Sequence, residues 1–253
     1  MSRRRRCGLM LAAVAGLLAF YVWGATGLRD FGADISQYGK TINSAVSSER
    51  QVTNAVSAVN FDYRAFDTMG EELILFISVV GVALLLREQR TDDVEVTREA
   101  ENAELTPRGS DAVRALGAVA VGATLLVGLY VVAHGNLTPG GGFQGGVILG
   151  AAFTLLYSAG NFTSLRRLQP APWMDVLHAT GAAGLVLLGL GGLLAGGAFF
   201  HNFLGTGTSG LLQSGGTIEL GNVAVGLEVT GASVLLGAEL LHAVTVGRGR
   251  SGA

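Results

Sequence analysis

The chain has 253 residues, of which 49% are hydrophobic and 14% are charged. This balance is far from that of an ordinary soluble domain and favours the lipid bilayer as the solvent. A formal net charge of -2 offers no basic surface for nucleic acid, and a single cysteine, Cys7, excludes an internal disulfide framework or a thiolate metal cluster.

Six apolar runs reach or approach the roughly 20 helical residues that are needed to cross a bilayer. They cover residues 8–28, 69–86, 112–133, 142–160, 174–200 and 220–246. We therefore expect an all-α integral membrane protein with about six transmembrane helices. The first run follows four arginines, as in a signal peptide, but no convincing small-residue cleavage site follows it, so we interpret it as a retained anchor.

The distribution of Lys and Arg predicts the orientation, because cytoplasmic segments near helix ends are enriched in them. With the N-terminus inside, 13 of the 17 Lys and Arg residues fall on the cytoplasmic side. The other four, Arg29, Lys40, Arg50 and Arg64, lie in the long outer connection. Both termini are therefore predicted to be cytoplasmic.

Residues 87–107 lose all apolar periodicity and carry charges of both signs, which is typical of an exposed linker. We place a charged cytoplasmic linker at 91–110. It separates a two-helix module, residues 1–90, from a four-helix module, residues 111–253. Thirty of the 39 glycines follow Asp111, which predicts close helix packing in the second module.

Acidic residues lie where the polar stretch VNFDYRAFDTMGEE enters the second apolar run. Thr68 and Glu71 have the spacing of a capping box, in which both residues would only stabilise the start of a helix. Alternatively, Glu71, with Asp67 nearby, supplies a carboxylate at membrane depth that is able to bind a proton or a cation. The sequence leaves both interpretations open.

A glycine-rich motif joins the third and fourth apolar runs, and its Pro-Gly segment cannot continue a helix. The motif consists of Pro139, Gly140, Gly141, Gly142, Phe143, Gln144, Gly145 and Gly146. It predicts a hairpin tip. If the tip enters the membrane, its polar backbone groups need hydrogen-bond partners, which could be the side chains of Gln144, Thr138 and His134. The alternative is a tight turn with glycine-mediated helix packing. His134 is interpreted first as a hydrogen-bonding residue at the water boundary and is retained as a candidate for the ion path.

The last apolar run contains Glu228 between apolar turns, and Glu239 follows eleven residues later. At about 100° per residue the two carboxylates share one face of a helix. An unpaired acid inside a membrane is costly, so Glu228 is a candidate for the ion path or for a structural polar contact. Glu239 is nearer the cytoplasmic end and could simply face water. Asp175 and His178, one turn apart at the start of the fifth run, are interpreted as interface residues.

The stretch HGNLTPGGGFQGGVILGAAFTLLY resembles the B subunit (MnhB/MrpB) of multi-subunit Mrp-type Na+/H+ antiporters, and SGGTIELGNVAVGLEV extends the resemblance. The stretch NAVSAVNFDYRAFDTMGE is similar to the C-terminal part of these antiporters' large A subunit, MrpA, and to the corresponding small subunit of membrane-bound hydrogenases, MbhE. By this resemblance, Glu71 and Glu228 correspond to the acids of the family's FDTxGE and GLEV patterns. Met69 stands where a branched aliphatic residue is common, and Glu219 stands where proline is common.

The resemblance implies a hetero-oligomeric antiporter of the bacterial inner (plasma) membrane that exchanges cytoplasmic Na+ for external H+. This chain would be an accessory subunit or part of the ion path, with Mrp-type subunits of the A, C, D, E, F and G kinds as partners. No cofactor is expected, and no phosphate loop, zinc motif or nucleophile elbow points to an autonomous enzyme. The alternatives are a membrane-arm subunit of an energy-converting hydrogenase or complex-I-like respiratory complex, and a purely structural scaffold.

Overall fold

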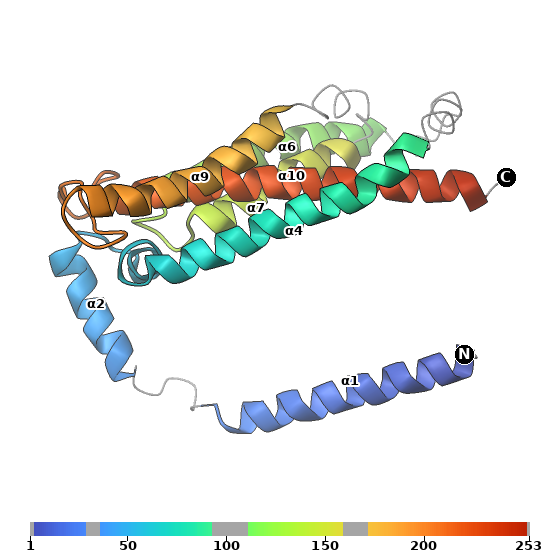
Figure 1. Cartoon of the computed structure of the whole chain (residues 1–253), viewed down its shortest axis with the longest axis horizontal. Coiled ribbons are helices and arrows are strands. Elements are labelled where there is room, and N and C mark those ends of the chain that lie inside the picture. The colour runs from blue at the N-terminus through green and yellow to red at the C-terminus, as the bar shows by residue number, and fades with distance from the viewer. Residues whose placement is uncertain (1–2, 29–35, 93–110, 159–171, 252–253) are drawn as a thin grey trace. The chain divides into compact units, whose positions relative to one another are not determined.

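The computed structural model describes residues 3–28, 36–92, 111–158 and 172–251, and every regular element in these ranges is helical (Figure 1). The elements are α1 (Arg3–Thr26), α2 (Gln37–Glu49), α3 (Ala55–Ala58), the π-helical turn η1 (Val59–Tyr63), α4 (Ala65–Asp92), α6 (Asp111–Ala133), α7 (Gly142–Ser158), α9 (Pro172–Leu194) and α10 (Thr217–Ser251). The prediction of an all-α fold is confirmed.

Five of the described helices are long and apolar enough to cross a membrane. The spans are Arg4–Thr26, Ala65–Leu86, Ala115–Ala133, Trp173–Leu194 and Thr217–Leu240, and a shorter apolar helix covers Gly142–Leu156. At 1.5 Å per residue, the whole of α7 extends about 25 Å, close to the roughly 30 Å of the hydrocarbon layer. The chain is a multi-pass membrane protein, and the cytoplasmic location of its termini stays a prediction.

Two helices have ends that differ from the predicted ones. α4 begins at Ala65 and continues to Asp92, so Thr68 lies inside the helix and the capping-box interpretation is wrong. Asp67 belongs to the first turn of α4, where the partial positive charge of a helix N-terminus favours an acid. α9 ends at Leu194 instead of residue 200, because Gly196 adopts a positive φ of 89° that no α-helix contains. Residues 93–110 of the predicted linker lie outside the described residues.

The described chain forms two compact units, Met1–Thr41 and Ile42–Ala253. In the first unit, α1 buries none of its side chains, as suits an apolar helix whose solvent is lipid. The second unit contains the remaining membrane helices and all the residues that line the pocket described below. This unit includes residues before and after the predicted linker.

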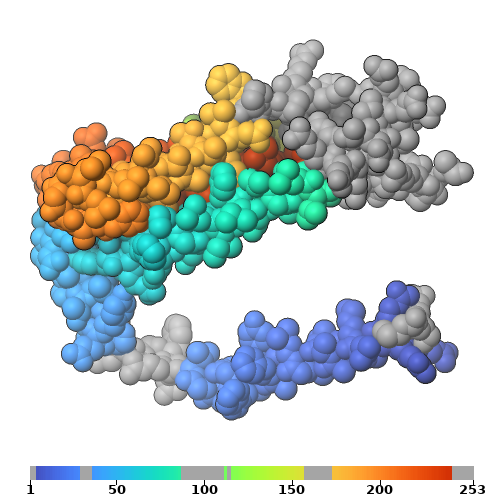
Figure 2. Space-filling model, in the orientation of Figure 1, coloured from blue at the N-terminus to red at the C-terminus, as the bar shows by residue number. Residues whose placement is uncertain are grey.

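α10 is the central helix of the second unit and packs against α4, α6, α7 and α9 (Figure 1). α4 and α9 also contact each other and lie side by side on one face of this unit (Figure 2). The buried core forms where the first half of α10 meets α3, η1, α9 and the loop after α9. Its members are Val46, Val52, Ala58, Phe61, Ala65, Leu185, Phe200, Ile218, Ala224, Val225 and Val229.

Glycines let the helix backbones approach α10 closely. A Cβ atom on Gly146 of α7 would lie 2.7 Å from Cβ of Val229, and one on Gly181 of α9 would lie 2.5 Å from the carbonyl oxygen of Ala224. Side chains larger than hydrogen do not fit at such distances. This geometry agrees with the glycine-mediated packing that the sequence indicated.

Candidate functional site

The α6–α7 turn, residues 134–141, is held by a side chain from the front of the chain. Asn54 accepts hydrogen bonds from the backbone N–H groups of Val56 and Ser57 and so caps α3. Its Nδ2 also donates to three carbonyl oxygens of the turn, those of Gly135, Thr138 and Gly140, at 2.7, 2.9 and 3.3 Å. One amide therefore connects α3 with a turn that lies more than 80 residues later in the sequence.

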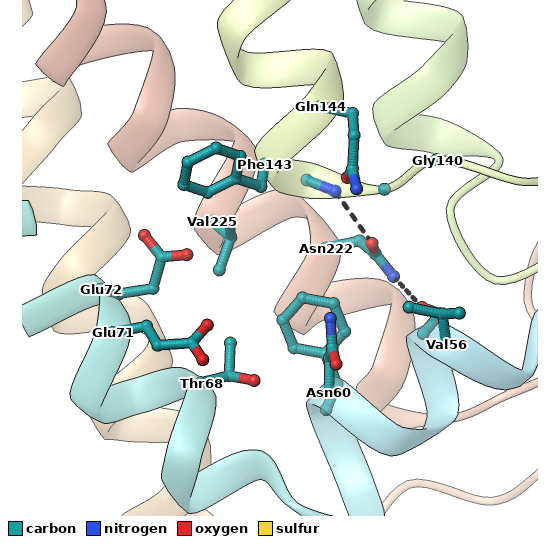
Figure 3. Close-up of a pocket in the computed structure, with 14 residues that line it drawn as sticks. Val56, Asn60, Thr68, Glu71, Glu72, Gly140, Phe143, Gln144, Asn222 and Val225 are labelled. Atoms are coloured by element: carbon teal, nitrogen blue, oxygen red, sulfur yellow. Dashed lines mark hydrogen bonds between the residues drawn. The ribbon is translucent and has the colours of Figure 1, made fainter. Parts of the chain in front are cut away.

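A second amide, Asn222 of α10, connects the same turn with the central helix. Asn222 is 1% exposed, and its Oδ1 accepts from the N–H of Gly142 at 3.0 Å. Its Nδ2 donates to the hydroxyl of Ser57 at 2.7 Å (Figure 3). The same Nδ2 also donates to the carbonyl oxygen of Ile218 at 3.1 Å. Asn54 and Asn222 together bind four backbone groups of residues 135–142, and neither side chain was predicted from the sequence.

The residues that were predicted to satisfy the turn contribute less. His134 stacks on Tyr130 with ring centroids 4.0 Å apart, and its Nδ1 lies 3.0 Å from the carbonyl oxygen of Tyr130. Thr138 donates from Oγ1 to the carbonyl oxygen of His134 at 3.3 Å. Phe143 and Gln144 are exposed at the start of α7. These contacts agree with a hydrogen-bonding role for His134.

A pocket of about 270 Å³ lies between α3, η1, α4, the α6–α7 turn and α10 (Figure 3). Its polar lining residues include Asn60, Thr68, Glu71, Glu72, Gln144 and Asn222. The π-helical turn supplies Asn60, and such turns often occur at functional sites. The pocket therefore brings the predicted acid Glu71 together with the glycine-rich motif.

The two adjacent glutamates of α4 differ in burial. Glu71 is exposed, whereas Glu72 is 4% exposed and its Oε2 has no hydrogen-bond partner among the described residues. The buried face of α4 runs through Thr68, Glu72 and Val79, which are four and seven residues apart. Helical periodicity across the polar start of this helix is the signal that could have identified Glu72.

Glu228 of α10 is completely buried, and neither of its carboxylate oxygens has a hydrogen-bond partner within the described ranges. It lies eleven residues after Thr217, about 16 Å along the helix, which is near the middle of a hydrocarbon layer of roughly 30 Å. Glu72 is close enough to interact with it electrostatically. Two buried carboxylates that repel each other require a proton or a compensating positive charge.

His178 of α9 completes this buried cluster and is 3% exposed. Its Nδ1 lies 3.2 Å from the backbone carbonyl oxygen of Glu228, and its ring stacks on Phe76 of α4 with centroids 4.7 Å apart. Its Nε2 has no hydrogen-bond partner in the described part of the chain. His178 therefore lies inside the junction of α4, α9 and α10, while Asp175, one turn earlier, is exposed.

The other predicted acids lie apart from the cluster. Asp67 is exposed and accepts from Nε of Arg64 at 2.7 Å. Glu239 is half-buried, eleven residues beyond Glu228 on α10, and His134 does not line the pocket. Across residues 3–28, 36–92, 111–158 and 172–251, no three His, Cys, Asp or Glu side chains are grouped so that they could hold a metal ion.

An ion pair outside the membrane spans supports the wall of the site. Asp62 of η1 forms a salt bridge with Arg50, whose guanidinium lies 5.3 Å from the ring centroid of Tyr63. Burial raises the pKa of the Asp62 carboxyl, and the charge of Arg50 opposes that shift. The pair connects the end of α2 to the π-helical turn that supplies Asn60 and Phe61 to the pocket.

Glu219, which stands where proline is common, stabilises the start of α10. Its Oε1 accepts from the N–H of Gly215 at 2.5 Å and from Nδ2 of Asn136 at 2.7 Å. Asn136 is 1% exposed and also donates to the carbonyl oxygen of Leu212 and the hydroxyl of Ser214. This acid therefore joins the α6–α7 turn to the first turn of α10.

We expect Glu219→Gln to leave stability nearly unchanged, because the amide oxygen can accept the same two hydrogen bonds. Glu219→Ala removes one acceptor of the buried Asn136 and the acceptor of the Gly215 N–H, and should lower the free energy of unfolding by about 1–3 kcal/mol. Thermal unfolding of the purified protein compares the two variants. An equal loss for Gln and Ala would show that the negative charge, and not the acceptor, is what matters.

Comparison with known proteins identifies the family to which the chain belongs. Residues 112–235 match the family described as a domain related to the MnhB subunit of Na+/H+ antiporter. An uncharacterized protein of Methanocaldococcus jannaschii is 30% identical over an alignment of 232 residues, and the match covers 85% of this chain and 87% of that protein. The chain belongs to the MnhB-related family. The predicted resemblance of the back module is thereby confirmed.

Solved complexes extend the similarity of this MnhB-related chain to nearly its full length. It matches a chain of the membrane-bound sulfane sulfur reductase, an archaeal respiratory membrane complex, with a TM-score of 0.70 and 30% identity, covering 92% of this chain and 97% of that one. It matches a chain of the Mrp complex from Dietzia sp. DQ12-45-1b with a TM-score of 0.69 and 25% identity, covering 95% of this chain and 26% of that one. The MnhB-related chain is therefore a membrane subunit of an Mrp-like complex.

A relative in Rhizobium meliloti shares a smaller part. The probable A/B subunit of a K(+)/H(+) antiporter in this bacterium is 29% identical over an alignment of 142 residues, and the match covers 49% of this chain and 14% of that protein. The MnhB-related chain thus corresponds to a small fraction of the much longer Rhizobium and Dietzia chains.

Proposed function

We propose that this chain is a subunit of a multi-subunit cation/proton antiporter that exchanges cytoplasmic Na+ for external H+, and that its buried carboxylates exchange the proton. The observation that carries the proposal is the pair Glu72 and Glu228, buried together in membrane-spanning helices with carboxylate oxygens that have no hydrogen-bond partner among the described residues. Acids are rarely kept in such a position unless they serve an ion or proton path.

The pocket supplies a route to these acids. Its lining contains Glu71 and Glu72 of α4, and Val225 of α10, one turn before Glu228, forms part of the same wall. A proton that enters between the polar side chains reaches Glu72 first and Glu228 next. When either acid releases its proton, a buried negative charge remains, and its unfavourable energy couples proton release to cation movement elsewhere along the path.

The proposal includes the front module. The match to the Mrp complex covers 95% of this chain on one longer chain, which supports residues 1–90 as a module that resembles the C-terminal part of the A subunit. The partners would be Mrp-type subunits of the A, C, D, E, F and G kinds in a bacterial inner membrane. In this arrangement the chain is one part of the transporter, without a catalytic site of its own.

A second candidate function has its own support. The match to the sulfane sulfur reductase covers 97% of the matched chain, so a respiratory complex contains a counterpart of almost the same extent. In such a complex, redox chemistry in other subunits would drive ion movement, and the same buried acids would belong to the driven path. The two candidates differ in the energy source and share the site.

The test is Na+-dependent proton transport in everted vesicles that contain the whole complex, with a native gel to verify assembly. After a pH gradient is imposed, addition of NaCl should release protons from the vesicles, while choline chloride should not. Absence of any response to Na+ or K+ in vesicles with assembled complex would contradict the antiporter. Co-purification of iron–sulfur subunits with the complex would favour the respiratory candidate.

A further inference from the structure

Among the described residues, His178 is the buried ionisable group for which the proposed function gives no role. α9 runs antiparallel to α10, since Gly181 faces the backbone of Glu228 and Gly231 faces the backbone of His178. His178 therefore lies three residues, about 4.5 Å, beyond the level of Glu228, and Trp173, the first residue of this span, is about 7.5 Å further along. The imidazole is located between the buried acids and the end of the bundle opposite the α6–α7 turn.

The backbone of Glu228 fixes which ring nitrogen of His178 carries a hydrogen. A carbonyl oxygen can only accept, so Nδ1, which lies 3.2 Å from the carbonyl oxygen of Glu228, is the N–H donor. The neutral imidazole then has its lone pair on Nε2. Nε2 is buried and has no hydrogen-bond partner within the described residues, so the ring that contacts the backbone of Glu228 keeps an unused proton acceptor.

Carboxyl groups of two packed helices lie around the ring of His178. α9 packs against α10 and α4, which contribute Glu228 and Glu72 near the ring, and Phe76 covers one ring face. Glu239 of α10 lies eight residues beyond Gly231, toward the same end of the bundle. On α9 itself the nearest acid is Asp175, which is exposed.

We propose that His178 accepts the proton that Glu228 releases and passes it toward the predicted cytoplasmic end; this step rests on the proposed function. The carboxylic acid of Glu228 loses its proton to Nε2, which gives a carboxylate and an imidazolium. A bridging water or a rotation of the Glu228 side chain completes the contact. The imidazolium then releases the proton from Nε2 and returns to the neutral tautomer that the Glu228 carbonyl oxygen selects. No other reactant is consumed.

The variant His178→Asn separates this role from a structural one. The Asn amide can donate to the Glu228 carbonyl oxygen as Nδ1 does, but it cannot accept and release a proton. We expect the complex to assemble, Na+-dependent proton flux in vesicles to fall roughly tenfold or more, and the dependence of the flux on pH to change. Asp175→Asn, one turn away and exposed, is the matched control and should retain wild-type flux.

Wild-type flux with an unchanged pH profile in His178→Asn would overturn the proposal. If this variant does not assemble, His178→Gln takes its place, because its longer amide occupies more of the space of the imidazole. Loss of flux in His178→Gln would then support the relay, and wild-type flux with an unchanged pH profile would overturn it. Loss of flux in Glu228→Gln together with full flux in His178→Asn would reject the relay and leave the proposed function in place. Full flux in Glu228→Gln would instead reject the proposed function itself.

Discussion

Glu228→Gln should abolish Na+-dependent proton transport while the complex still assembles. Glutamine has nearly the same shape and introduces no charge that must be buried, so packing around α10 should be preserved. It cannot bind and release a proton, and we expect the flux to fall by roughly 100-fold. The measurement is proton release from everted vesicles after addition of NaCl, with the amount of assembled complex determined on a native gel.

Glu219→Gln is the matched control for this variant because it makes the same chemical change on the same helix. Glu219 accepts two local hydrogen bonds, and its amide analogue can do the same, so transport should be retained. If Glu228→Gln also transports at the wild-type rate, the carboxylate is not on the ion path. The chain would then be a structural scaffold within its complex.

Gly142→Ala is expected to prevent stable packing of α7 against α10. An added Cβ would lie 2.9 Å from the backbone nitrogen of Gly226 and from Cβ of Val225, and closer still to the carbonyl oxygen of Asn222. Backbone atoms of a buried helix cannot move away as a flexible side chain can, so we expect a loss of about 3 kcal/mol or more in the free energy of unfolding. Thermal unfolding of the purified complex, together with its yield, measures the effect.

Gly122→Ala is the control for backbone propensity. Gly122 lies in α6 with no atom within 4 Å of an added Cβ, so the substitution should be neutral or stabilise the helix by up to about 1 kcal/mol. Equal thermal midpoints for Gly142→Ala and the wild type would show that the α7–α10 contact can expand without loss. In that case the close approach of these backbones does not determine the fold.

The helices could be predicted from the sequence because hydropathy over about 20 residues reports directly on membrane insertion. Their ends could not be predicted as well. Asp67 lowers the hydropathy at the start of α4, so the apolar run begins after it, although an acid is favourable in the first turn of a helix. The apolar residues after Leu194 extend the fifth run in the sequence, but the backbone turns at Gly196, and Phe200 folds back into the core.

The sequence identified Glu228 and the region of Glu71, but it could not identify the other buried residues of the candidate site. The reason is that hydropathy does not tell which face of a membrane helix is buried. Glu71 and Glu72 are neighbours that point about 100° apart, and packing against α10 buries the second. His178 lies near the end of an apolar run, and only the crossing of α9 with α10 and α4 shows that it is buried. Asn54 caps α3 locally, but its contacts with the α6–α7 turn join segments that are distant in the sequence, which no local sequence pattern reveals.

The most direct test of the buried acid pair compares Glu72→Gln with Glu71→Gln in the vesicle assay. These adjacent residues carry the same side chain and differ in burial, so all other conditions are matched. If the buried acids exchange the proton, we expect Glu72→Gln to lose Na+-dependent proton transport with the complex assembled, while Glu71→Gln retains most of it. Loss of transport in Glu71→Gln with full transport in Glu72→Gln would contradict it.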